Sequence, residues 1–229
     1  MARIDRRLLV ALGSFAIASI SVSVDAAAQA HSDSARFGEC TPVTMRAGRD
    51  VGCFILTERP IGSFDERPVY WHVTRLVSRS DADTIDARGG VVIDAFGNAW
   101  LLTIGDSVWR PRRGEQQAVI GPLPLTQGLA YSALYMEASM RPGMKSAIHR
   151  HSGPEAWYTL SGETCLETPD GAMTGKAGGP PVIVPGGPPM ELTATGTGIR
   201  RSIVLILHDS SQPPTRMESQ WKPRGLCSH

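Results

Sequence analysis

The sequence predicts an all-β protein, a barrel or sandwich of short strands, and two observations lead to this fold class. Apolar runs from Gly52 onward are short and are separated by Gly, Pro, Asp and Asn at close intervals, which is typical of strands joined by turns. No long amphipathic stripe interrupts them, and only residues 80–87 suggest a short helix or turn. The absence of a repeat of tens of residues argues against a solenoid or propeller.

The predicted strands form two groups along the chain. The first group comprises residues 69–73, 91–93 and 100–104. Phe96-Gly97-Asn98 predicts a hairpin turn between the last two, because Gly and Asn tolerate positive φ. The second group comprises residues 131–139, 156–160, 165–168, 182–184 and 203–208. Pro169-Asp170-Gly171 predicts another hairpin, and two Gly-Gly-Pro-Pro runs flank the strand at 182–184, since Pro is confined to strand ends.

Residues 1–30 have the features of a signal peptide. Three arginines precede an apolar stretch from Leu8 to Ile20, and Ala28-Gln29-Ala30 is a small-x-small cleavage site. An uncleaved anchor is the alternative, but the stretch is short and broken for a stable membrane span. We therefore expect a periplasmic or secreted protein, exported by either the general or the twin-arginine route.

The charge balance points to a small-molecule partner. Removal of residues 1–30 takes away three basic and two acidic side chains, so the formal net charge falls from +1 to zero. Nucleic-acid binding needs a basic excess on one face, and we expect no such partner. The sequence leaves open whether the protein forms a homodimer.

Four cysteines, Cys40, Cys53, Cys165 and Cys227, lie in the exported part. An even number in an oxidising compartment favours disulfides, although buried free thiols are the alternative. Four cysteines allow three pairings. Loop closure favours Cys40–Cys53, which leaves Cys165–Cys227 to tie the C-terminal tail to the barrel.

The segment from Gly143 to Gly162 carries the candidate chemistry. His149 and His151 are two residues apart and lie on the same face of an extended chain. Glu155 follows a Gly-Pro turn that lets the chain fold back and bring a carboxylate to the two imidazoles. Two imidazoles and a carboxylate with open positions are the ligands of non-haem Fe(II) oxygenases, and they also suit Mn, Ni, Zn or Cu.

This segment resembles the first motif of the cupin superfamily, G-x5-H-x-H-x3-E-x6-G, at every defined position. Gly179, Pro185 and Gly187 resemble the second motif of the same superfamily, and sixteen residues separate the two motifs. The resemblance covers about residues 129–209 and implies a cupin-type antiparallel β-barrel (jelly roll), with additional N-terminal β-strands. It also implies a metal held by His149, His151 and Glu155.

The second motif departs from the family at the position of the third histidine ligand, where this chain has Met190. A thioether would coordinate weakly and favour copper. The other reading, an apolar pocket wall beside a three-ligand site, fits the usual use of Met as a core filler. The position of each residue along its strand suggests further pocket candidates: Met136, Met140, Trp157, Thr159 and His208. For the two methionines, a place in the ordinary barrel core is the alternative.

The expected organisation is a signal peptide at 1–30, a cupin barrel at 129–210 and a C-terminal tail at 211–229. Residues 31–128 are either a β-rich extension of one barrel or a degenerate second cupin half. Three functions stay open: a metal-dependent oxidoreductase of dioxygenase type acting on a small molecule, a metal-dependent lyase or isomerase, and a non-catalytic small-ligand-binding protein. The resemblance does not choose among them, since the fold alone does not fix the function. No general base can be identified from the sequence.

Overall fold

The computed structural model describes residues 39–82 and 90–227, so the expected signal peptide lies outside the described residues. Strands dominate the described part. The only helical elements there are two short 3-10 turns, η1 (Val43–Met45) and η2 (Arg79–Ala82). Of the short helix or turn expected at 80–87, residues 80–82 belong to η2, and the rest lies outside the described residues. No helix in these ranges is long and apolar enough to cross a bilayer.

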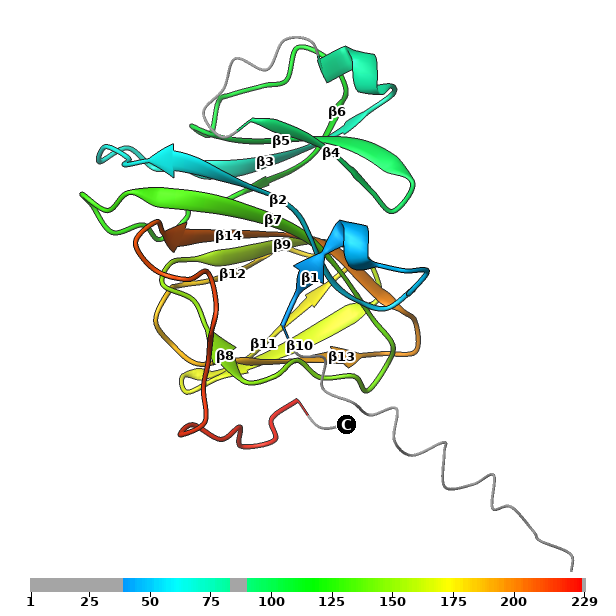
Figure 1. Cartoon of the computed structure of the whole chain (residues 1–229), viewed down its shortest axis with the longest axis vertical. Coiled ribbons are helices and arrows are strands. Elements are labelled where there is room, and N and C mark those ends of the chain that lie inside the picture. Colours follow the sequence, from blue (N-terminus) through cyan, green and yellow to red (C-terminus); the bar gives the residue numbers. More distant parts are fainter. Residues whose placement is uncertain (1–38, 83–89, 228–229) are drawn as a thin grey trace, which may run out of the picture. The chain divides into compact units, whose positions relative to one another are not determined.

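A six-stranded central sheet organises the protein (Figure 1). All of its neighbouring strands pair antiparallel except the short first pair, which is parallel. In spatial order, its strands are β1 (Thr41–Pro42), β2 (Gly52–Gly62), β7 (Tyr131–Met140), β14 (Arg200–Asp209), β9 (Glu155–Ser161) and β12 (Val182–Val184).

A second sheet faces the central one. Its strands are β11 (Gly171–Lys176), β10 (Glu163–Thr168) and β13 (Glu191–Thr195). Bridges from Lys145 to Thr193 and from His149 to Met190 connect it to the short pair β8 (His149–Arg150) and β15 (Arg216–Met217). These two layers match the jelly-roll arrangement expected for residues 129–210.

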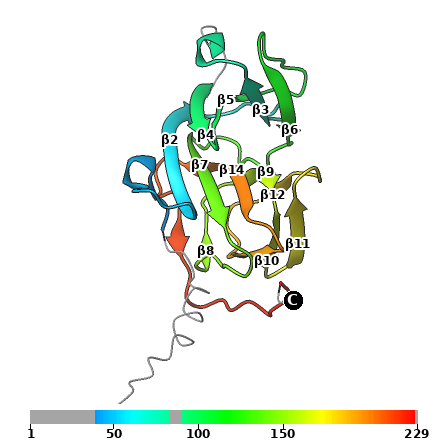
Figure 2. The same cartoon turned by 90° about the vertical axis from the view of Figure 1, so that its right-hand side faces the viewer.

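An outer sheet covers the other face of the central sheet (Figure 2). Its spatial order is β4 (Val91–Ala95), β5 (Asn98–Gly105), β3 (Tyr70–Leu76) and β6 (Glu115–Ile120). The turn between β4 and β5 consists of Phe96 and Gly97, both with positive φ, as the sequence predicts. Residues before 128 thus supply β1 and β2 to the central sheet as well as a sheet of their own.

The central sheet is buried on both faces, which the alternation along β7 makes clear. All ten residues of β7 are buried. Tyr131 and Tyr135 point into an outer core shared with the outer sheet, whereas Leu134 and Met136 point into an inner core shared with the second sheet. Burying each large apolar side chain contributes about 1.5–3 kcal/mol to folding.

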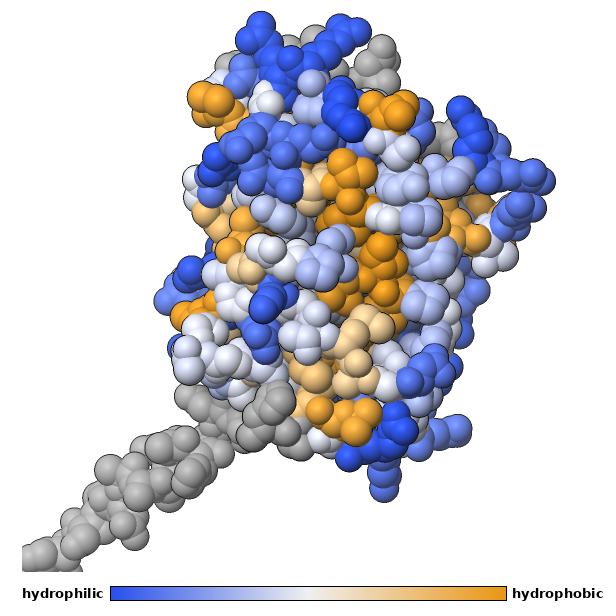
Figure 3. Space-filling model, turned by 180° about the vertical axis from the view of Figure 1, so that it is seen from behind, coloured by the Kyte–Doolittle hydropathy of each residue, from blue (hydrophilic) through white to orange (hydrophobic). Residues whose placement is uncertain are grey.

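The face shown in Figure 3 has hydrophilic residues around a central strip of hydrophobic residues. Two disulfides anchor the ends of the described chain, and they have the pairing favoured by the sequence. Cys40–Cys53 ties the first described residues to β2, and Cys165–Cys227 ties the tail to β10. For a sequence separation of 62 residues, chain-entropy arithmetic gives the second disulfide about 4 kcal/mol of stabilisation.

Candidate metal centre

The first histidine of the motif, His149, lies on β8, a two-residue strand held on both sides, and His151 follows directly after the strand ends. On one side β8 pairs with β15 of the tail, and on the other the main chain of His149 pairs with Met190. The intervening Arg150 turns away and donates to the carbonyl oxygen of Gly187 and to the carboxylate of Glu218. The one-residue spacing therefore places the two imidazoles side by side, with ring centroids 4.9 Å apart.

Glu155 reaches the same place from the central sheet, because the chain turns sharply at Gly153. A Cβ built on Gly153 would lie 2.0 Å from the carbonyl oxygen of Leu207, so the turn depends on glycine. Glu155 then opens β9 between β14 and β12. The local sequence thus runs from β8, beside the second sheet, to β9 of the central sheet, and brings the histidines and the glutamate together from the two sides.

Main-chain carbonyls fix the orientation of both imidazoles. Nδ1 of His149 lies 2.8 Å from the carbonyl oxygen of Ala147, and Nδ1 of His151 lies 2.6 Å from that of Pro214. A carbonyl oxygen only accepts, so each Nδ1 carries the proton. In the neutral imidazole each Nε2 then has a free lone pair, and such second-layer bonds are the usual support of metal-binding histidines.

The remaining ligand atoms of the three residues converge on one another. One ligand atom from each of His149, His151 and Glu155 lies within 4.8 Å of the others. Nε2 of His151 and Oε2 of Glu155 are buried, 3.4 Å apart, and without hydrogen bonds in the described structure. Buried polar atoms are costly unless they are paired, and a divalent cation between these three donors would satisfy them. The residues fit a metal.

Each group perturbs the pKa values of the others. Burial, together with the neighbouring His151, lowers the pKa of His149. Burial acts in the same direction on His151, but the adjacent Glu155 carboxylate outweighs it and raises the pKa. Burial alone would raise the pKa of Glu155, whereas the two histidines and the more distant Arg200 lower it below its usual value. Glu155 is thus ionised at neutral pH.

The site opens on a cavity of about 310 Å³ between the central sheet, the second sheet and the tail. Its walls are largely apolar, its rim includes the Cys40–Cys53 disulfide, and the tail from Pro213 to Met217 covers one side. This volume suits a small organic molecule. Apart from the metal-site residues, the charged residues lining it within the described chain are Glu39 and Arg200.

No family model matches the sequence, and no curated protein matches it. Solved structures similar to this one include a double-stranded β-helix protein from Klebsiella pneumoniae, with 18% identity, 43% of this chain and 82% of that chain covered, and a TM-score of 0.34. A predicted oxalate decarboxylase from Thermotoga maritima has 24% identity, coverages of 33% and 65%, and a TM-score of 0.30. The DMSP lyase DddQ from Ruegeria pomeroyi has 19% identity, coverages of 37% and 42%, and a TM-score of 0.32. This chain thus spans less than half of that lyase.

Two facing sheets enclose the His-x-His pair and the glutamate of the first motif, as the resemblance predicted. The chain has the all-β, jelly-roll-like fold of facing antiparallel sheets that the sequence predicts. Within this fold Met190 is fully buried, with 0% exposure, and packs in the inner core next to His149, with which its main chain pairs. Met190 is a core residue there and is not among the residues that line the cavity, so both readings of Met190, as a ligand and as a pocket wall, stay predictions.

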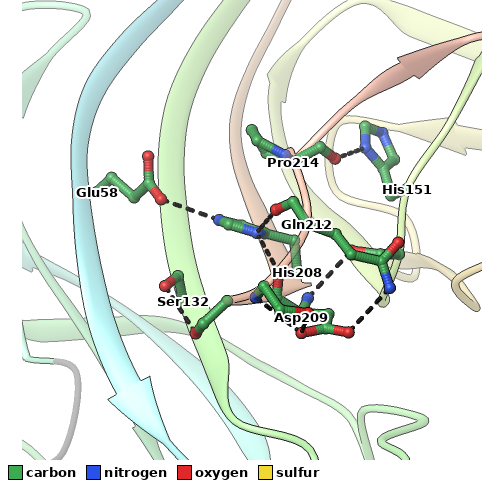
Figure 4. Close-up of polar contacts among 10 residues, drawn as sticks. Glu58, Ser132, His151, His208, Asp209, Gln212 and Pro214 are labelled. Carbon is green, nitrogen blue, oxygen red and sulfur yellow. Dashed lines mark hydrogen bonds and ion pairs between the residues drawn. The ribbon is translucent and has the colours of Figure 1, made fainter.

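The other predicted pocket residues lie in different places. Met136 lines the cavity beside the metal site. Trp157 belongs to the inner core, Met140 to a small cluster with Met144, and Thr159 bonds to Ser202. His208 points away from the metal site to Glu58 on β2, 3.0 Å away, while the ring of His151 faces Pro214 (Figure 4).

Sequence reasoning missed two contributors to the site, Arg200 and the carbonyl of Pro214. Arg200 begins β14 and has the same parity as Val204 and Ile206, which also line the cavity. Its place was therefore available from strand alternation. The Pro214 carbonyl has no signal in the sequence, because any residue supplies a carbonyl and only the path of the tail brings this one to His151.

Proposed function

We propose that this protein is an exported, metal-dependent oxidoreductase of dioxygenase type that acts on a small molecule in the cupin cavity. The observation that carries the proposal is the ligand set: two Nε2 atoms and one carboxylate converge at the cavity wall, and no fourth His, Cys, Asp or Glu of the described chain joins them. Such a set leaves open coordination positions, the arrangement of non-haem Fe(II) oxygenases.

The residues of the chain hold and shield the metal. His149 and His151 bind through Nε2, Glu155 adds a negative charge, and the Ala147 and Pro214 carbonyls keep both rings in place. The bound metal, iron or another divalent transition ion, supplies the redox or Lewis-acid chemistry that imidazole and carboxylate lack. The apolar walls exclude water from the reacting centre, which strengthens electrostatic interactions there.

The alternative, a lyase or isomerase, needs a group to remove a proton from the substrate. His149, His151 and Glu155 are engaged as ligands in this proposal. Glu39 is the remaining carboxylate lining the described cavity, and it is exposed at the rim. The shortage of an inner base favours the oxidoreductase over a proton-transfer enzyme.

Export is part of the proposal. The two disulfides favour an oxidising compartment, because cytosolic thiols are normally kept reduced. We expect the mature chain to begin at His31, which N-terminal sequencing of the exported protein would establish. Recovery of an intact Met1 in the membrane fraction would contradict it.

The test of function combines metal content with oxygen consumption. Mature wild-type protein should contain close to one transition metal per chain by mass spectrometry, and His149→Gln should lose most of it. His72→Gln is the matched control, since His72 is buried in the outer sheet and bonds to Gln116 and the Asp106 carbonyl. Metal-dependent oxygen uptake with phenolic or thiol compounds supports the oxidoreductase. Metal binding without turnover of any compound would favour a binding protein, and no metal binding would refute the proposal.

A further inference from the structure

Arg200 is a buried cation whose donors are largely unused. Its relative exposure is 1%, and its Nε and Nη2 have no hydrogen-bond partner among the described residues. Nη1 faces the thioether sulfur of Met140 at 3.8 Å, and a thioether is only a weak acceptor. Burying a charge without a good partner is expensive, so an unsatisfied guanidinium calls for an explanation.

The surroundings hold Arg200 in place at the wall of the metal-site cavity. The ring of Trp157 lies under its guanidinium, 5.8 Å from centroid to Cζ. The backbone of Arg200 packs against Gly162, where a Cβ would lie 2.6 Å from the Arg200 Cα. Burial lowers the pKa of Arg200 only to about 10, so the side chain stays charged at neutral pH.

The charges of the complete site call for an anion. A divalent metal, one ionised Glu155, two neutral histidines and Arg200 sum to an excess of about two positive charges in a low-dielectric cavity, where charges interact strongly. A guanidinium presents donors in a planar fork that matches a carboxylate. The cavity walls around it are apolar, with Leu134, Val204 and Ile206 among them.

We propose that Arg200 binds the carboxylate of the small-molecule ligand, and that this ligand is an organic acid with a compact apolar body. The guanidinium of Arg200 donates to the carboxylate, and the aliphatic wall takes up the rest of the molecule. Arg200 is thus a ligand-anchoring residue beside the proposed metal. The inference rests on the proposed function for the identity of the cavity, but the contact with Arg200 does not require the metal to be present.

The experiment compares acids with their uncharged amides by isothermal titration calorimetry. The probes are benzoate, phenylacetate and 3-methylbutanoate, each paired with its amide, and the protein is the mature chain in metal-free and metal-loaded forms. Wild type should bind at least one acid at least tenfold more tightly than its amide. Arg200→Met should weaken that acid by roughly 10- to 100-fold, as expected for a lost charge-assisted hydrogen bond, and leave the amide unchanged.

Two further variants sharpen the result. Arg201→Met removes the same charge from the exposed neighbour on β14 and should bind the acid like wild type. Arg200→Lys keeps the charge without the fork and should fall between wild type and Arg200→Met. Met fits an apolar site and removes an unpaired buried charge, so the fold should persist, as circular dichroism would verify.

The outcomes separate this inference from the proposed function. Arg200→Met that keeps wild-type metal content but loses the preference for the acid supports the inference. If every acid binds no better than its amide, or folded Arg200→Met binds the acids like wild type, the inference is overturned while the metal proposal stands. An acid preference that depends on Arg200 in a protein unable to hold metal supports the inference and refutes the metal-dependent function.

Discussion

Substitution of Gly153 by alanine tests whether the turn between the ligands sets their geometry. The new Cβ would lie 2.0 Å from the Leu207 carbonyl oxygen, and real Cβ contacts essentially never fall under 3.0 Å. The turn must therefore move by about 1 Å, whereas metal–ligand distances tolerate about 0.2 Å. All three ligands remain in the sequence, but Glu155 is displaced relative to the histidines.

We expect Gly153→Ala to weaken metal binding at least as much as loss of a second-layer bond, roughly 10- to 100-fold. Overpacking should also lower the unfolding free energy by about 1–3 kcal/mol. For a domain of this size that corresponds to a drop of roughly 2–12 °C in melting temperature. Metal affinity is measured by competition with a chromophoric chelator, and stability by thermal unfolding of the metal-free protein.

Gly198→Ala is the matched control, because a Cβ there meets nothing within 4 Å and no left-handed φ is required. It should match wild type in both measurements. If Gly153→Ala binds metal as tightly as Gly198→Ala does, the turn does not position Glu155, and the reasoning fails.

Three further predictions follow from the packing. Met190→Leu preserves apolar volume in the inner core and should leave the metal content of the protein unchanged. A fall in Cu(I) affinity alone in this variant would identify Met190 as a thioether ligand. Met190→His should tighten the binding of divalent metals. The double change Cys165→Ala and Cys227→Ala should lower the unfolding free energy, measured by denaturant titration, by about 4 kcal/mol. It should also weaken metal binding, because the tail is no longer tied to β10. An unchanged unfolding free energy and an unchanged metal affinity would contradict these two effects. Leu205→Ala, in the outer core, should cost about 2–5 kcal/mol of stability with metal affinity unchanged, and a parallel loss of metal would show that the outer core supports the site.

The metal site could be predicted from the sequence because its three ligands lie within seven residues of one another. Strand parity and one glycine turn suffice to bring His149, His151 and Glu155 together. The all-β class was equally accessible, since each strand has its own apolar run and its own turn residues.

The stacking of three layers was harder to foresee. Apart from Glu137, β7 is apolar or small on both faces, which is the pattern of a strand covered on two sides. That pattern indicates double burial but does not identify the covering element as residues 70–120. Arg200 was overlooked for a related reason: an arginine beside Arg201 at the start of a strand looks like surface, and only its parity with Val204 and Ile206 reveals the cavity.

The bond between His151 and Pro214 has a consequence for how the tail can vary. Its acceptor is a main-chain oxygen, so replacement of almost any tail side chain leaves it in place. What the bond requires is the correct number of residues between the end of β14 at Asp209 and Pro214. A single-residue insertion there would shift a different carbonyl, or none, to the imidazole. The tail is therefore tolerant of new residues and intolerant of new lengths.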